Sequence, residues 1–149
     1  RQPNIITSLE LDSAVMEQNN LRFQKKYAEI EANEVRYEEY QTEDADYILV
    51  AFGSSARICN KTVQLARQQG IKAGILRPIT LWPFPTKEIA KLADRAKGFL
   101  VAELNAGQMI EDVRLAVNGK VPVEHYGRMG GMLFSPDEIL QALKEKVIK

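Results

Sequence analysis

From residue 46 onward, short apolar runs alternate with segments whose apolar residues recur every three or four positions. The runs are short and rich in branched and aromatic side chains, which favours strands over buried helices. We expect strands at Tyr47–Phe52, Ala73–Thr80, Phe99–Leu104 and Val121–Tyr126. Runs that are apolar at successive positions are typical of a parallel sheet that is covered on both faces.

The segments that follow these runs have the pattern of amphipathic helices. Their inward positions are Ala56, Cys59, Val63, Ala66; Ile89, Leu92, Ala93, Ala96; Met109, Ile110, Val113, Ala116, Val117; and Ile139, Leu140, Leu143, Val147. Gly70 ends the first helix, and Thr86 is expected to cap the second. Ser135 and Glu138 form a capping box around Pro136, which predicts the start of the last helix.

Residues 1–46 are polar and differ from the rest of the chain. Residues 12–33 have a helix-forming composition, but their apolar positions are too sparse for a continuous face. Residues 29–46 hold eight acidic side chains against Arg36 alone, a self-repelling composition that favours exposure. Within them, alternation over residues 35–40 is enough for a short edge strand. We therefore predict a helical or linker segment, 1–33, followed by an α/β domain, 34–149.

Strands that alternate with helices indicate a parallel sheet with helices on both faces, because right-handed crossovers leave few other arrangements. The predicted fold is a three-layer α/β/α domain, mostly parallel, with residues 35–40 as its candidate antiparallel edge strand.

Composition excludes several classes of function. The net charge is zero and the pI is about 6.8, so nothing indicates a nucleic-acid or anionic-membrane partner. No apolar run approaches the roughly 20 residues that span a bilayer, and no secretory signal pattern is present. The single cysteine, Cys59, fits a reducing cytoplasm, and one thiol cannot hold an iron–sulfur cluster. Because the chain starts at Arg1 rather than Met, we expect it to be a piece of a longer protein.

The segment from Arg77 to Pro85 is the most informative in the chain. Three prolines bracket the only tryptophan at the end of a predicted strand, and they stiffen the exit from that strand. Arg77, Trp82 and Phe84 are therefore candidate interface residues. Aromatic and arginine side chains on a rigid loop often dominate contact energies.

Ligands of open α/β sheets bind at the carboxyl ends of strands, where strand order reverses. Two turns are expected to face each other there. The first, Gly53–Arg57, offers Ser54, Ser55 and Arg57 to an anion, although one serine serving as a helix cap explains it more simply. The second offers Glu103, Asn105 and Gln108. Glu103 could act as a general base, but a cap or interface role is favoured because no partner group is identifiable beside it.

Three further features have simple structural explanations or alternatives. His125, the only histidine, lies on a predicted strand beside Glu124 and is expected to have a hydrogen-bond partner rather than a metal. Cys59 is expected to be a buried small hydrophobe. Arg128, Met129 and Met132, among three glycines, form either an adaptable contact surface or a plain loop. No constellation completes a mechanism, so we do not expect the chain by itself to be an enzyme.

Taken in order, four segments resemble the last domain of the alpha subunit of 2-oxoacid:ferredoxin oxidoreductases. They are Ala51–Arg57, Leu76–Pro85, Glu103–Met109 and Tyr126–Gly131. The resemblance extends to the helix at 16–31 and the lead-in at 36–40, and so covers essentially the whole chain. The 2-oxoisovalerate type is the best match, and the 2-oxoglutarate type is hard to exclude.

This resemblance implies a transketolase C-terminal-like fold with a five-stranded sheet whose first strand is antiparallel. It also implies a parent complex that decarboxylates a 2-oxoacid with thiamine diphosphate, Mg²⁺, iron–sulfur clusters and coenzyme A. The expected partners are the rest of the alpha subunit and the beta, gamma and ferredoxin-type delta subunits, with a homodimer also conceivable. No catalytic, cofactor or metal residue is carried over, and the implied role is assembly. The alternative is a free-standing module that binds a small molecule or anion at the strand-end crevice.

Overall fold

The computed structural model describes residue 3 and residues 9–148, and the sheet lies at the centre of the α/β part. Its strand order is β1-β3-β2-β4-β5. The strands are β1 (Tyr37–Tyr40), β2 (Tyr47–Val50), β3 (Ala73–Pro78), β4 (Gly98–Glu103) and β5 (Val123–Gly127). Strand β1 runs antiparallel to β3, and the other pairings are parallel. The predicted α/β fold and its antiparallel edge strand are confirmed.

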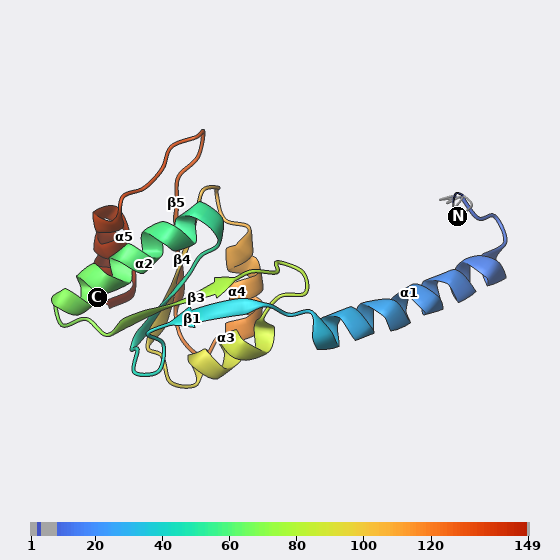
Figure 1. Ribbon diagram of the computed structural model, residues 1–149, viewed down its shortest axis with the longest axis horizontal. Helices are drawn as coiled ribbons and strands as arrows, with labels where there is room; N and C mark the ends of the chain where they lie inside the picture. The colour runs from blue at the N-terminus through green and yellow to red at the C-terminus, as the bar shows by residue number, and fades with distance from the viewer. Residues whose placement is uncertain (1–2, 4–8, 149) are drawn as a thin grey trace.

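Helices cover both faces of the sheet (Figure 1). They are α2 (Gly53–Gln68), α3 (Thr86–Ala93), α4 (Met109–Val117) and α5 (Pro136–Leu143), which continues into the π-helical turn η1 (Lys144–Ile148). Alternation along β2 divides the core, because Ile48 and Val50 pack towards α3 and α4 while Leu49 and Ala51 pack towards α2 and α5. This two-sided burial explains why the strand runs are apolar at successive positions.

The helix starts show where local pattern succeeds and where it fails. At α5 the capping box is present, with Ser135 and Glu138 bonding each other's backbone N–H groups. The expected caps at Ser54 or Ser55 and at Thr86 are wrong. Phe52 takes the N-cap position of α2, so both serines already lie inside the helix, where their hydroxyls cannot cap it. Pro85 takes the corresponding position before α3.

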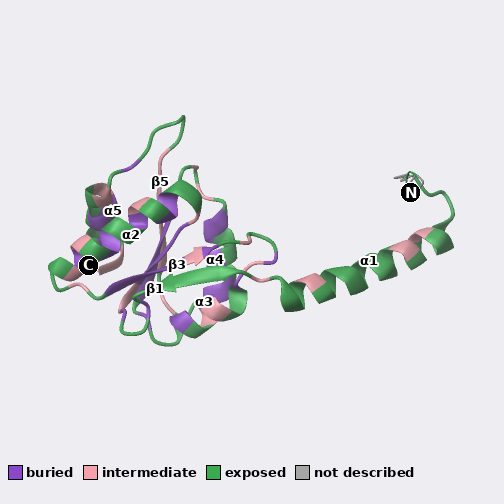
Figure 2. Ribbon diagram, viewed as in Figure 1, coloured by how far each residue is buried: buried purple, intermediate pink, exposed green. Residues whose placement is uncertain are grey.

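Helix α1 (Ser13–Asn33) lies away from the sheet and projects from the β1 side of the domain (Figure 1). Asp12 caps it by accepting the N–H groups of Ala14 and Val15. None of its 21 residues, all of which are described, is buried, and Figure 2 shows the helix almost wholly exposed. Within the described residues, no helix is long and apolar enough to cross a membrane.

Candidate functional site

The loop after β3 is held in place by backbone and hydroxyl hydrogen bonds. The Thr80 hydroxyl accepts the N–H of Arg36 at 3.0 Å and donates to the carbonyl of Pro83 at 2.8 Å. Pro83 and Pro85 are buried, and Phe84 packs against the hydrophobic core while remaining partly exposed. The loop is therefore anchored at both sides of Trp82, as the sequence indicated.

Trp82 is 54% exposed, and its indole contacts an aromatic side chain of α1. The Tyr27 ring meets its indole edge-to-face, with centroids 5.6 Å apart, and Phe23 stacks on Tyr27 at 6.4 Å. Edge-to-face aromatic pairs of this kind contribute roughly 0.5–1.5 kcal/mol beyond their buried area. This row of three rings joins the exposed helix to the domain.

A groove of about 690 Å³ lies between α1 and the proline loop. Ala28, Ala32 and Val35 line one wall, and Trp82 and Phe84 lie on the other. Glu31, Lys87 and Glu88 also line it, and they add polar atoms to an otherwise apolar wall. Sequence reasoning missed this groove because it judged α1 too sparse in apolar residues. The small residues at 28 and 32, one helical turn apart, were the available signal.

Arg77 lies on β3 and donates to Glu38 of β1 at 2.9 Å across the sheet edge. Its Nε atom is buried without a partner among the described residues. Together with Gly53, Arg57 and Asn60, Arg77 lines a hollow of about 140 Å³ at the start of α2. The Gly53 turn thus shares a hollow with β3. Ser54 is exposed and Ser55 is buried at the same helix start.

The Glu103 carboxylate is wholly buried and is engaged by the start of α4. It accepts the backbone N–H of Met109 at 2.8 Å, of Ile110 at 3.1 Å and of Gln108 at 3.3 Å. The Asn105 amide donates to it at 3.2 Å. A carboxylate at a helix N-terminus satisfies N–H groups that have no partner within the helix and opposes the positive end of the helix dipole. This geometry matches the cap that the sequence favoured over a general base.

His125 of β5 lies beside this carboxylate, with Nε2 3.7 Å from a Glu103 oxygen. Nε2 is buried and, within the described part of the chain, has no hydrogen-bond partner, so the expected partner is not found. Burial lowers the pKa of His125, although the Glu103 charge opposes the shift. The added Cβ of a side chain at Gly127 would lie 2.5 Å from this ring and would also collide with the backbone carbonyl of Asn105, so the end of β5 is closely packed against the segment after β4.

The loop after β5 is tethered at one end and exposed beyond it. Arg128 donates to Glu138 at 2.8 Å, which links the loop to the capping box of α5. Bonding to the Ser135 backbone lowers the pKa of Glu138, and the Arg128 charge adds to the effect. Met129 and Met132 are exposed beyond this tether.

Cys59 lies in the core, as expected, and burial raises the pKa of its thiol to about 12. Among the described residues, no three His, Cys, Asp or Glu side chains gather in a way that could hold a metal ion. With one cysteine, the side chains here do not fit a cysteine-held iron–sulfur cluster.

Residues 45–139 match the family model of the pyruvate:ferredoxin oxidoreductase core domain II. The chain belongs to this family. Among curated relatives of this domain II chain, the ketoisovalerate oxidoreductase subunit VorB of Methanothermobacter marburgensis is 47% identical over 142 residues. That alignment covers 95% of this chain and 40% of the relative. The 2-oxoglutarate synthase subunit KorA of the same organism is 37% identical, over 68% of this chain and 27% of the relative.

Solved structures carry the same fold. In the 2-oxoglutarate:ferredoxin oxidoreductase from Magnetococcus marinus, the matching region has a TM-score of 0.74 at 21% identity, covering 93% of this chain and 24% of that one. A split-gene transketolase in an inactive beta4 tetramer matches with a TM-score of 0.64 at 16% identity, and the match covers 76% of this chain and 41% of the transketolase chain. The transketolase-like architecture of this domain II chain is thereby confirmed. The chain spans about 40% of the length of the VorB relative.

Proposed function

We propose that this chain is the assembly domain of the alpha subunit of a 2-oxoacid:ferredoxin oxidoreductase of the ketoisovalerate type. The whole complex would convert 2-oxoisovalerate to an acyl-CoA and reduce ferredoxin in the cytoplasm. Thiamine diphosphate, Mg²⁺, iron–sulfur clusters and coenzyme A would be held by other domains and subunits. The similarity to VorB favours the substrate type, and residues 1–33 and 34–149 would be the two parts of this chain.

The observation that carries the assembly role is the exposure of α1. A helix of 21 residues with no buried side chain gains little stability from its own backbone hydrogen bonds, because most helical stability in proteins comes from packing of one face against other elements. Phe23, Tyr27 and Trp82 nevertheless hold it against the proline loop and present three partly exposed rings. Exposed aromatic side chains on ordered elements are what a protein contact uses as anchors.

Two observations weigh against the alternative of a ligand-binding module. The hollow that Gly53 and Arg57 line has about 140 Å³, below the roughly 300–1,000 Å³ of small-molecule pockets. A larger hollow of about 410 Å³ adjoins it at Arg77, but that hollow lies along β1 and β3 and is lined by none of the predicted crevice residues. The Glu103 carboxylate, the other half of the predicted crevice, is already bonded to α4. We therefore retain assembly as the proposed function.

The test is made in the complete complex, with the alpha subunit carrying Trp82→Ala or Phe23→Ala. We expect either variant to weaken co-purification of the other subunits and to lower 2-oxoisovalerate-dependent ferredoxin reduction in proportion. Leu115→Ala is the matched control, because Leu115 is 77% exposed on α4, on another element. Full assembly and full activity of both aromatic variants would contradict the proposal, as would release of CO₂ from 2-oxoisovalerate by this chain alone.

A further inference from the structure

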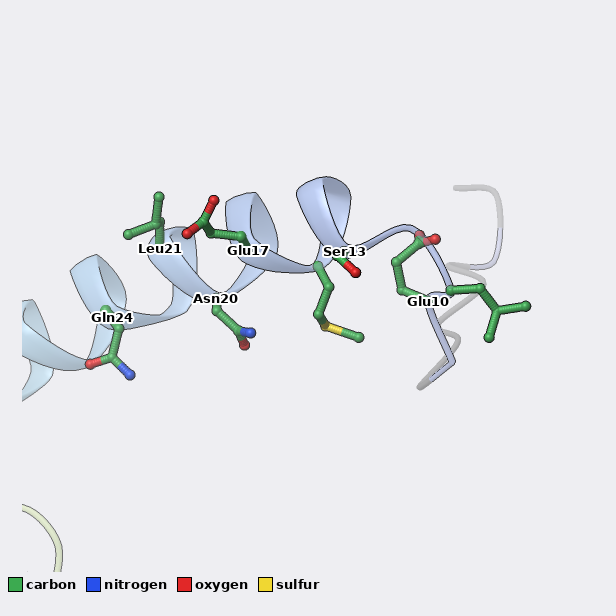
Figure 3. Close-up of a pocket in the computed structure, with 8 residues that line it drawn as sticks. Glu10, Ser13, Glu17, Asn20, Leu21 and Gln24 are labelled. Atoms are coloured by element: carbon green, nitrogen blue, oxygen red, sulfur yellow. The ribbon is translucent and has the colours of Figure 1, made fainter.

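One face of α1 carries a regular seam. Its members recur at alternating spacings of four and three residues, which places them along one side of the helix. They are Ala14, Gln18, Leu21, Lys25, Ala28 and Ala32. The large apolar member is Leu21 in the N-terminal half, which is 57% exposed and projects to the same side of the helix as Glu17, whereas Asn20 and Gln24 project to the opposite side (Figure 3). A hollow of about 390 Å³ beside it is lined by residues 10–24 alone.

The C-terminal half of the same seam is concave. Ala28 and Ala32 are small, and they form one wall of the 690 Å³ groove that Trp82 and Phe84 close on the other side. A protruding leucine and an apolar groove therefore lie on the same face of one helix, eleven residues apart at Leu21 and Ala32. Neither half of this face has a partner among the described residues that would bury it.

We propose that two copies of this chain pair through α1 in antiparallel orientation, with Leu21 of each copy inserted into the groove of the other. Setting Leu21 opposite Ala32 of the second copy also sets Lys25 opposite Ala28. The two-fold axis then passes between these positions. Each copy contributes the same knob and the same groove, so the contact is isologous and closes at two copies.

The charges along α1 complement each other in this register. Arg22, Lys25 and Lys26 lie in its middle, and Glu29 and Glu31 follow towards its end. Within the described residues none of these five side chains forms a salt bridge. In the antiparallel register Arg22 of each copy lies beside Glu29 of the other. Complementary flanking charges of this kind set the orientation of paired helices.

This pairing rests on the proposed assembly role of α1 and names a partner for it, a second copy. The contact is small and flanked by exposed charges. We therefore expect a weak dimer that dissociates as salt is raised, because exposed charge pairs are screened.

Sedimentation velocity over a concentration series of this chain tests the proposal. We expect a monomer–dimer equilibrium, and we expect Leu21→Ala to weaken dimerisation at least tenfold while Leu115→Ala leaves it unchanged. Arg22→Glu and Glu29→Arg should each weaken it, and the double variant R22E/E29R should restore it, because the reversed charges again face each other. None of these positions contributes to the buried core, so the α/β domain should keep its melting temperature.

A chain that stays monomeric at every concentration, or a dimer that L21A leaves intact, would overturn the pairing. Failure of the double variant to recover would overturn the antiparallel register. If the chain is monomeric but Trp82→Ala still blocks assembly of the whole complex, self-pairing is rejected and the assembly role stands. If the chain dimerises as expected but Trp82→Ala and Phe23→Ala leave assembly of the whole complex unchanged, the assembly role is rejected instead.

Discussion

Replacing Glu103 with glutamine is the sharpest test of how the β4–α4 junction works. The carboxylate is wholly buried and accepts three backbone N–H groups at the start of α4 in addition to the Asn105 amide. A glutamine has the same shape, but it keeps one acceptor oxygen and turns an NH₂ group towards N–H donors. One buried donor is then left unpaired, and the charge that opposed the helix dipole is lost.

The magnitude follows from these two losses. A buried donor left unsatisfied costs about 1–3 kcal/mol, and hydrogen bonds to a charged group contribute about 1.5–3 kcal/mol. A carboxylate at a helix N-terminus adds up to about 2 kcal/mol when it is partly buried. Since these contributions overlap, we expect E103Q to lower the free energy of unfolding by about 3–4 kcal/mol, a large fraction of a typical domain's stability.

Urea unfolding of the two proteins, followed by circular dichroism, measures this difference through the transition midpoint at constant slope. Glu111→Gln is the matched control, because Glu111 is in the first turn of the same helix but 70% exposed. Glu111→Gln should lower the free energy of unfolding by less than about 1 kcal/mol, as substitutions of other surface carboxylates do. If E103Q were as stable as E111Q, Glu103 would not be the cap of α4 and a chemical role would have to be reconsidered.

Three further predictions concern the packed interior. Because the pKa of His125 is lowered in the folded state, by burial and by Lys146 and Arg114 against the opposing Glu103 charge, the unfolded chain binds more protons below the ordinary value of 6.5. Stability should therefore be full above that pH and fall as pH drops below it, and His125→Asn should flatten this part of the stability–pH curve; an unchanged slope would refute the assignment. Cys59, with a thiol pKa of about 12, should react with a thiol reagent at pH 8 only as fast as the domain unfolds, and rapid labelling of the native protein would contradict its burial. Gly74→Ala would place a Cβ 2.5 Å from the Gln41 carbonyl oxygen and should lower the free energy of unfolding in urea by about 1–3 kcal/mol. This cost should exceed that of Gly98→Ala, whose new Cβ approaches a side-chain atom of Val147 at 2.5 Å but lies 3.5 Å from the nearest backbone atom, the Pro122 carbonyl oxygen.

Much of the fold could be predicted because the signals are local. Apolar runs bounded by helical periodicity placed the four parallel strands and their helices, and acidic alternation placed β1 at an edge. The Ser135 capping box was predicted correctly because both partners lie within four residues of each other. The caps at Ser54 and Thr86 were wrong because a serine or threonine near a helix start does not say at which residue the backbone begins to coil.

The candidate site could be predicted only in part, since its contacts join distant segments. The proline loop was recognised as rigid and its aromatic residues as candidate contacts. That Trp82 meets Tyr27, 55 positions earlier, and that small residues of α1 complete a groove with the loop were not predictable from either segment alone. Glu103 was predicted to be either a cap or an interface group, without its donors being identified, and His125 was expected to have a hydrogen-bond partner that the packing around its Nε2 does not supply.

By itself, the sequence determined the order of the elements and the two-sided sheet. These depend on residue type and on spacings of two to four positions, which the local backbone imposes. Only the tertiary structure decided which partners the polar and aromatic groups meet: α1 lies against the proline loop, Arg77 against Glu38, and Glu103 against α4. Such pairings depend on where the sheet brings separate segments together, and no local pattern records that.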